Sequence, residues 1–110
     1  MNENEEHQLI GMESWNPELG FFPKKEIEGK THQTEITRGY AERKEKRLVY
    51  MLETYDSIFG NRKIQITNNQ AIKLKSKSVP FKLYFQVAPT VVNGKDCFSL
   101  KISENKQEWF

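Results

Sequence analysis

The sequence predicts a mainly β fold, a small antiparallel β-barrel that carries an irregular acidic N-terminal arm. Three observations predict it. Short runs in the second half alternate apolar and polar residues, short turn signals separate these runs, and no strong helical stripe interrupts them. With 110 residues the chain has the length of one domain, so we expect residues 1–12 to be a flexible acidic tail and residues 13–110 to form a single domain.

The segments before the strands are irregular or charged. Residues 13–23 contain two prolines, one glycine and three aromatic residues, which disfavours a helix and predicts an ordered loop lying across the body. We expect a strand pair within residues 25–45. The apolar run 48–52 then predicts a buried strand, and the basic cluster 43–47 leads into it.

The period-2 pattern is clearest after residue 60. It predicts strands over 63–67 and 72–75 joined by a turn at Asn68-Asn69, with Ile72 and Leu74 pointing into the core. A further strand covers 81–87, and Asn93-Gly94 predicts a hairpin that returns into a strand over 98–102. Closure of these strands into a barrel would remove the exposed edges of the sheet.

The charge of the chain is divided unevenly. Residues 1–22 hold five acids and no Lys or Arg, a charge of −5, whereas the 17 bases of the remainder face ten acids, a charge of +7. A basic body attracts phosphate-rich polymers, and an acidic segment joined to it can screen the same surface. Nucleic-acid binding is therefore the first functional hypothesis.

Enzymatic, metal and cofactor chemistry find little support in the sequence. It has no glycine-rich phosphate loop, no Asp-rich metal cradle and no nucleophile motif, so we expect no enzyme, no metal and no cofactor. Cys97 is the single cysteine, which excludes an internal disulfide and predicts a buried, inert thiol. His32 lies in a polar stretch and is expected to be solvated. The start of the chain lacks a signal-peptide layout, and no apolar run is long enough for a bilayer, which favours the cytoplasm.

Basic residues supply the candidate RNA-binding site. Lys73, Lys75 and Lys77 occupy every second position, so on a strand they would form a basic ridge that Lys63 extends. The alternative is a solvated outer face that discourages aggregation. Tyr40 lies among bases and is the candidate ring for stacking on an unpaired base. The RNA-binding candidates are Arg38, Tyr40, Arg43, Lys44, Lys46, Arg47, Arg62, Lys63, Lys73, Lys75 and Lys77.

The C-terminus ends in the aromatic pair Trp109-Phe110 beside Glu108. Such a tip can dock in a basic pocket of a partner protein, or it can fold back onto the body of its own chain. We expect it to fold back.

Residues 59–92 resemble the YdcP-like and PrgU-like small proteins of conjugative plasmids and integrative elements in Gram-positive bacteria. The similar parts are the short strand Arg62-Lys63-Ile64-Gln65-Ile66 and the long strand 81–91, which ends at a proline-containing bend. The resemblance implies a PUA-like β-barrel, a fold often used to bind RNA, and a regulator on a mobile element that restrains surface or transfer functions. The acidic arm and residues 93–103 depart from the family pattern.

Two functions follow from these observations. The first is a non-enzymatic regulator that binds single-stranded or structured RNA through the basic ridge. The alternative is a protein-interaction module that inhibits or adapts a host or element protein through its acidic arm or its C-terminal aromatic tip. The oligomeric state and the nature of the RNA are open at this point.

Overall fold

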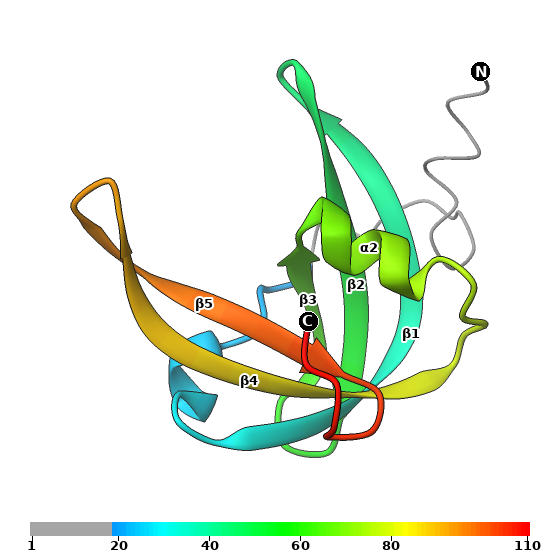
Figure 1. Cartoon of the computed structure of the whole chain (residues 1–110). Helices are drawn as coiled ribbons and strands as arrows, with labels where there is room; N and C mark the ends of the chain where they lie inside the picture. Colours follow the sequence, from blue (N-terminus) through cyan, green and yellow to red (C-terminus); the bar gives the residue numbers. More distant parts are fainter. Residues whose placement is uncertain (1–18) are drawn as a thin grey trace.

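The computed structural model describes residues 19–110, in which a single antiparallel sheet of five strands dominates (Figure 1). The order of the strands across the sheet is β3-β2-β1-β4-β5. The elements in chain order are η1 (Lys24–Ile27), β1 (Thr31–Lys44), β2 (Arg47–Asp56), β3 (Gly60–Ile66), α2 (Asn68–Leu74), β4 (Phe81–Val92) and β5 (Lys95–Ser103). The mainly β, antiparallel fold expected from the sequence is confirmed.

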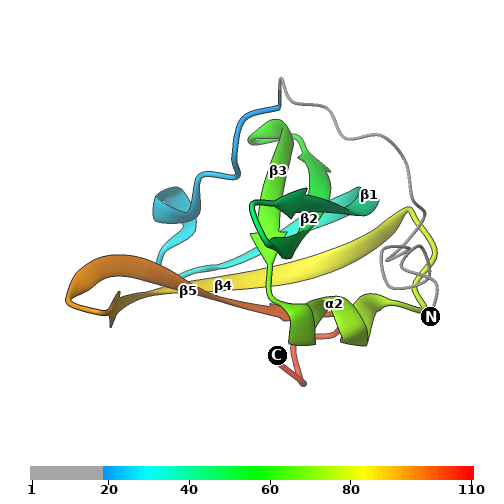
Figure 2. The same cartoon turned by 90° about the horizontal axis from the view of Figure 1, so that it is seen from above.

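Strand β1 joins the two halves of the sheet. Its first part, from Thr31 to Ile36, pairs with β4, and its second part, up to Lys44, pairs with β2. The register shifts between Ile36 and Arg38, which marks a β-bulge at Thr37. Bulges bend a strand and increase its twist. The sheet accordingly curls into a half-barrel, as the view from above shows (Figure 2).

The half-barrel is open, because β3 and β5 are edge strands that do not pair with each other. Residues 20–29 cross between the two halves instead. Phe21 forms a parallel bridge with Lys63 of β3, and Glu28 forms one with Val87 of β4. Between these bridges, Phe22 and Ile27 are buried in the core. This part of the irregular segment expected over 13–23 therefore does pack against the body, whereas residues 13–18 and the predicted tail 1–12 lie outside the described residues.

The core fills the concave face of the sheet. Its almost completely buried residues include Ile36 of β1, Leu52 of β2, Ile64 of β3, and Leu83 and Phe85 of β4. Helix α2 adds Ala71 and Leu74 to the same cluster. The predicted alternation over 81–87 is confirmed by the burial of Leu83, Phe85 and Val87 and by the outward side chains between them. The predicted hairpin at Asn93-Gly94 is also present, with positive φ angles of 53° and 77°.

The strand expected over 72–75 is wrong, because residues 68–74 form helix α2. Thr67 caps the helix: its side chain accepts from the backbone N–H of Gln70, and the Gln70 side chain accepts from the backbone N–H of Thr67. This reciprocal capping box fixes the helix start at the residues expected to form a turn. Leu74 is buried as expected, whereas Ile72 is 59% exposed.

The strand pair expected within residues 25–45 is also wrong. A single long strand, β1, covers most of that range, and the basic cluster 43–47 lies at its hairpin turn into β2, where Glu45 has a positive φ of 55°.

At the other end of the chain, the expected fold-back of the C-terminus is confirmed. The backbone of Phe110 forms two hydrogen bonds with that of Ile102 (2.8 and 2.9 Å), and its ring packs against the core.

Candidate nucleic-acid interface

Apart from Arg38 of β1, the predicted basic residues lie in three separate places and not on one ridge. Arg43, Lys44, Lys46 and Arg47 belong to the β1–β2 hairpin, Arg62 and Lys63 to β3, and Lys73 to α2, which Lys75 and Lys77 follow. Lys73 is on a helix, which turns by about 100° per residue, and Lys75 and Lys77 lie beyond its end, so the three lysines do not project from one face of a strand. The strand-borne ridge of Lys73, Lys75 and Lys77 is therefore incorrect.

Several of these cations are engaged within the protein. Arg38 lies 3.7 Å from the Glu53 carboxylate, and Lys77 forms an ion pair of 2.8 Å with Glu104. Arg62 donates from Nε to the backbone carbonyl of Phe59 (3.1 Å). Lys63 is largely buried and Lys73 is exposed; their ammonium groups lie 4.9 Å from the ring centroids of Phe21 and Phe110, respectively. These contacts indicate structural roles for five of the ten basic candidates.

Tyr40 is not an exposed stacking ring. It is only 1% exposed, and its hydroxyl is buried without a hydrogen-bond partner. Burial raises the pKa of Tyr40 to about 12, with Glu53 and Glu42 adding to the effect and Arg38 opposing it. The bulge at Thr37 shifts the phase of β1, which places Tyr40 beside Met51 on the convex face of the sheet.

Basic and polar groups do converge on a groove at the end of β3. This strand stops at Ile66, opposite Tyr50, so the first residues of β2 have no partner from β3. The groove beside this free edge has a volume of about 480 Å³. Its lining includes Lys24, Arg47, Tyr50, Gln65, Thr67 and Asn68. It thus combines two cations, an aromatic ring and three uncharged hydrogen-bonding side chains.

A second groove of about 380 Å³ continues from the first toward β5 and shares Lys24, Gln65 and Thr67 with it. Its far side includes Thr90, Cys97 and Phe98. Cys97 is partly exposed there, so the prediction of a buried thiol is wrong. Together the two grooves follow the opening between β3 and β5, where the barrel is not closed by strand pairing.

Lys24 is the common element of the two grooves, and sequence reasoning did not select it. It is half-buried, and burial lowers its pKa, an effect that the nearby Cys97 thiol only partly opposes. No carboxylate of residues 19–110 forms an ion pair with its ammonium group. A buried cation without an anion is costly, so this position favours an anionic ligand. The doublet Lys24-Lys25 was visible in the sequence, but its burial depends on the crossing of residues 20–29.

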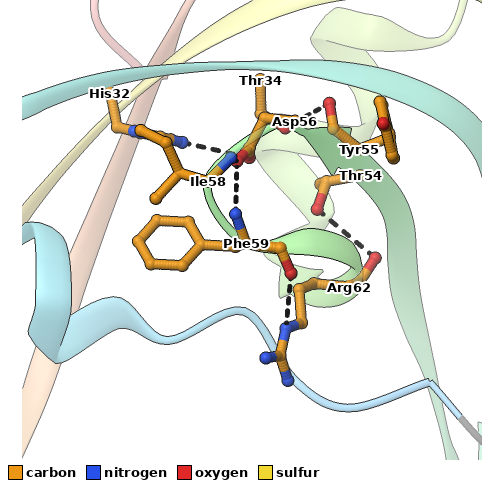
Figure 3. A network of polar contacts seen from close by, with 8 residues as sticks. All are labelled: His32, Thr34, Thr54, Tyr55, Asp56, Ile58, Phe59 and Arg62. Atoms are coloured by element: carbon orange, nitrogen blue, oxygen red, sulfur yellow. Dashed lines mark hydrogen bonds and ion pairs between the residues drawn. The ribbon is translucent and has the colours of Figure 1, made fainter.

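His32 takes part in a polar network under the β2–β3 loop (Figure 3). Its side chain is 11% exposed, so the prediction of a solvated histidine is wrong. Because an ionised carboxylate only accepts, His32 Nε2 donates to Asp56 Oδ2 (3.1 Å). The His32 ring also contacts the rings of Phe22 and Phe59. Asp56 Oδ1 also accepts from the backbone N–H groups of Ile58 (3.0 Å) and Phe59 (2.8 Å). The network anchors the loop to β1.

The hydrogen bonds at Asp56 change its acidity. Partial burial on its own would raise the pKa of this carboxyl, but hydrogen bonds from the Phe59 backbone, His32 and the Ile58 backbone outweigh burial and lower it. Every acceptor oxygen of Asp56 is thus used by the fold itself. No hydroxyl or thiol in Figure 3 is positioned as a nucleophile activated by His32, because the Thr34 hydroxyl donates to the carbonyl of Tyr55 (3.1 Å).

Two further searches cover residues 19–110 only. In this part of the chain, no group of three or more His, Cys, Asp or Glu side chains is arranged to hold a metal ion. None of its helices has the length and apolar character needed to cross a membrane.

Comparison with known proteins gives no match: no protein-family model, no curated protein and no solved structure is similar to this chain at a significant level.

Proposed function

We propose that the protein is a non-enzymatic regulator that binds single-stranded RNA along the two connected grooves between β3, α2 and β5. The observation that supports this most directly is the half-buried Lys24, which lines both grooves and has no anionic partner in the described part of the chain. A phosphate bound there would offset the cost of burying the ammonium group.

The rest of the groove fits a nucleotide chain better than a single small anion. Arg47 supplies a second cation along the first groove, and Lys46 and Lys75 add exposed charge on the neighbouring hairpin and after α2. Tyr50 and Phe98 offer ring surfaces, one in each groove, on which bases can stack. Gln65, Thr67 and Asn68 can donate to or accept from base edges and ribose hydroxyls.

The proposed role on a mobile element, restraining surface or transfer functions from the cytoplasm, rests on the family resemblance of residues 59–92.

The rival proposal, a protein-interaction module, loses one of its two contacts in this structure. The C-terminal tip is occupied within the chain, because Phe110 is bonded to Ile102 and to the side chain of Gln70. Its acidic arm lies outside the described residues.

The test is a binding titration of a fluorescein-labelled, mixed-sequence RNA of about a dozen nucleotides, followed by anisotropy at several salt concentrations. With four or five phosphate contacts, the log–log salt dependence should have a slope of about −3 for a single strand. The double variant Lys24→Met, Arg47→Met removes two phosphate contacts. Its affinity for the RNA should fall about tenfold for each contact, and its salt slope should become less negative by about 1.4.

The matched control is Lys82→Met, which removes one exposed charge on β4, away from both grooves. It should change the affinity much less than Lys24→Met alone, which removes one charge from the grooves. Absence of binding at low salt, or an equal loss in the control, would refute the proposal. The same titration with DNA of the same sequence tests whether ribose hydroxyls contribute.

A further inference from the structure

A third groove, the outer groove, lies on the face of β1, β4 and β5 that points away from the core. Val87 of β4 is buried, whereas its neighbours Gln86 and Ala88 are exposed on this outer face. The small side chain of Ala88 leaves space between longer ones, and the outer groove has a volume of about 330 Å³. Its lining includes Lys30, Thr31, Gln86, Ala88, Ser99 and Lys101.

The outer groove carries positive charge. Lys30 and Lys101 are both exposed, and neither ammonium group forms an ion pair within residues 19–110. No carboxylate of the described part of the chain lines this groove. Thr31 Oγ1 accepts a hydrogen bond from Gln86 Nε2 (3.1 Å), which leaves the hydrogen of the Thr31 hydroxyl free to donate. Two cations beside a hydroxyl donor suit a phosphate group.

The outer groove meets the second groove at β5. Ser99 lines both of them, and Lys24 lies in the second groove. Strand β5 is at the edge of the sheet, and among the described residues the backbone pairing on its free side is that of Ile102 with Phe110. The β4–β5 hairpin extends away from β2 and β3 (Figures 1 and 2). A flexible polymer in the second groove can therefore pass around this edge to the outer face.

The free edge of β5 offers backbone hydrogen-bonding groups along that path. Ile102 exchanges both of its backbone hydrogen bonds with Phe110, so its N–H and C=O point away from β4. In an antiparallel ladder this orientation recurs at every second residue. The N–H and C=O groups of Leu100 and Phe98 therefore also point away from β4.

Two observations confirm this orientation. The carbonyl of Leu100 accepts from the Gln70 side chain (2.9 Å), which is not part of the ladder. Pro89, which has no N–H to donate, lies opposite Phe98. Within residues 19–110, the outward N–H groups of Phe98 and Leu100 have no hydrogen-bond partner. Backbone N–H groups are common donors to the phosphate oxygens of nucleic acids.

We infer that the bound RNA strand continues from the second groove around the free edge of β5 into the outer groove, where Lys30 and Lys101 hold one or two further phosphates. This inference rests on the proposed RNA binding and extends it to the opposite face of the sheet. Lys101 follows Ser99 by two residues, about 7 Å along the strand, and two strand spacings of about 5 Å separate β5 from β1. Small β-barrels bind about 4–16 nucleotides, a length sufficient for this path.

The experiment compares two fluorescein-labelled RNAs of mixed sequence, with lengths of about six and about 12 nucleotides, by anisotropy at several salt concentrations. The shorter RNA is sufficient for the first two grooves, whereas the longer one also reaches the outer groove. In the double variant Lys30→Met, Lys101→Met, the affinity for the longer RNA should fall several-fold. Its salt slope should become less negative by about 1.4 if two phosphate contacts are lost. Binding of the shorter RNA should stay as in wild type.

A second variant keeps every charge. Ala88→Leu fills the outer groove at an exposed position, so it should weaken binding of the longer RNA and leave the shorter one unaffected. The matched control is Lys82→Met, which removes a charge from the same face of β4, at a position opposite Glu35 and outside the groove. This control should keep the full preference for the longer RNA.

The outcomes separate this inference from the proposed function. If both RNAs bind, but the double variant or Ala88→Leu retains the full preference for the longer RNA, the path around β5 is overturned while RNA binding in the first two grooves stands. An equal loss for both lengths also overturns the path. If neither RNA binds to the wild-type protein at low salt, the proposed function itself is refuted, and this inference is refuted with it.

Discussion

Gln70 connects three parts of the fold, and its replacement should be among the most destabilising single changes outside the apolar core. The side chain is 5% exposed. Its oxygen accepts from the backbone N–H of Thr67 (2.9 Å), and its amide nitrogen donates to the carbonyls of Leu100 (2.9 Å) and Phe110 (3.1 Å). One amide group thus holds the start of α2, the edge strand β5 and the C-terminus together.

The magnitude follows from the number of bonds. Replacing Gln70 by Leu keeps a similar volume but removes three hydrogen bonds: those with the Thr67 N–H and the Leu100 carbonyl, and one of the two that the Phe110 carbonyl accepts. At about 1 kcal/mol for each bond, the free energy of unfolding should fall by about 3 kcal/mol. For a domain of this size, this loss corresponds to a decrease in Tm of about 12–24 °C.

The assay is thermal and urea unfolding of wild type, Gln70→Leu and Gln70→Glu, with the exposed Gln107→Leu as the matched control. Gln70→Glu retains the acceptor for Thr67 but loses both donors, and its negative charge faces two carbonyls. At pH 7, Gln70→Glu should therefore be at least as destabilising as Gln70→Leu. Its free energy of unfolding should recover partly at acidic pH, where the protonated carboxyl can donate a hydrogen bond again. A Tm of Gln70→Leu equal to that of Gln107→Leu would refute this reasoning, because water would then satisfy the same groups.

Two further outcomes are expected. Leu74→Ala should lower the free energy of unfolding by about 2–5 kcal/mol because Leu74 is fully buried, whereas Ile72→Glu should change it by no more than about 0.5 kcal/mol. A strand over 72–75 with both side chains in the core would make both variants severely destabilised, and urea unfolding distinguishes the helix from that strand. Asp56→Asn should cost about 1–2 kcal/mol at pH 7 in the same assay. Because the folded-state pKa of Asp56 is lowered, its contribution exists above the unfolded pKa of about 3.9 and is lost as the pH falls through the folded value. The urea midpoint of Asp56→Asn should thus approach that of wild type in acid, whereas the exposed Asp96→Asn should follow wild type at every pH; a constant gap for Asp56→Asn would contradict the assignment.

The strands of the second half could be predicted because their information is local. In β4 and β5 every second residue is apolar, and Asn93-Gly94 specifies the turn between them. Strand β1 was harder, since its bulge at Thr37 shifts the inward positions from Ile36 to Gly39 and interrupts the alternation. The bulge is a property of the paired sheet, so no single-sequence pattern announces it.

The strand prediction over residues 72–75 failed for a different reason. Ile72 and Leu74 match a period of 2, but Thr67-x-x-Gln70 before them is also the pattern of a capping box, and Gln70, Ala71 and Leu74 form one helical face. That signal was present in the sequence and outweighs the short alternation. The candidate site was less accessible to prediction. His32 meets Asp56 across 24 positions, and Lys24 becomes half-buried only because residues 20–29 cross to β4.

The pairing of β1 with both β2 and β4 has a consequence for how the chain folds. Three of the four ladders join consecutive strands through short turns, so β1–β2–β3 and β4–β5 can each form early from local contacts. Only the pairing of β1 with β4 is remote in sequence, with Thr31 and Gln86 separated by 55 positions. Because closing that loop costs chain entropy, we expect this pairing to be the slow step. We therefore expect the formation of this one ladder to set the rate at which the two halves of the sheet unite.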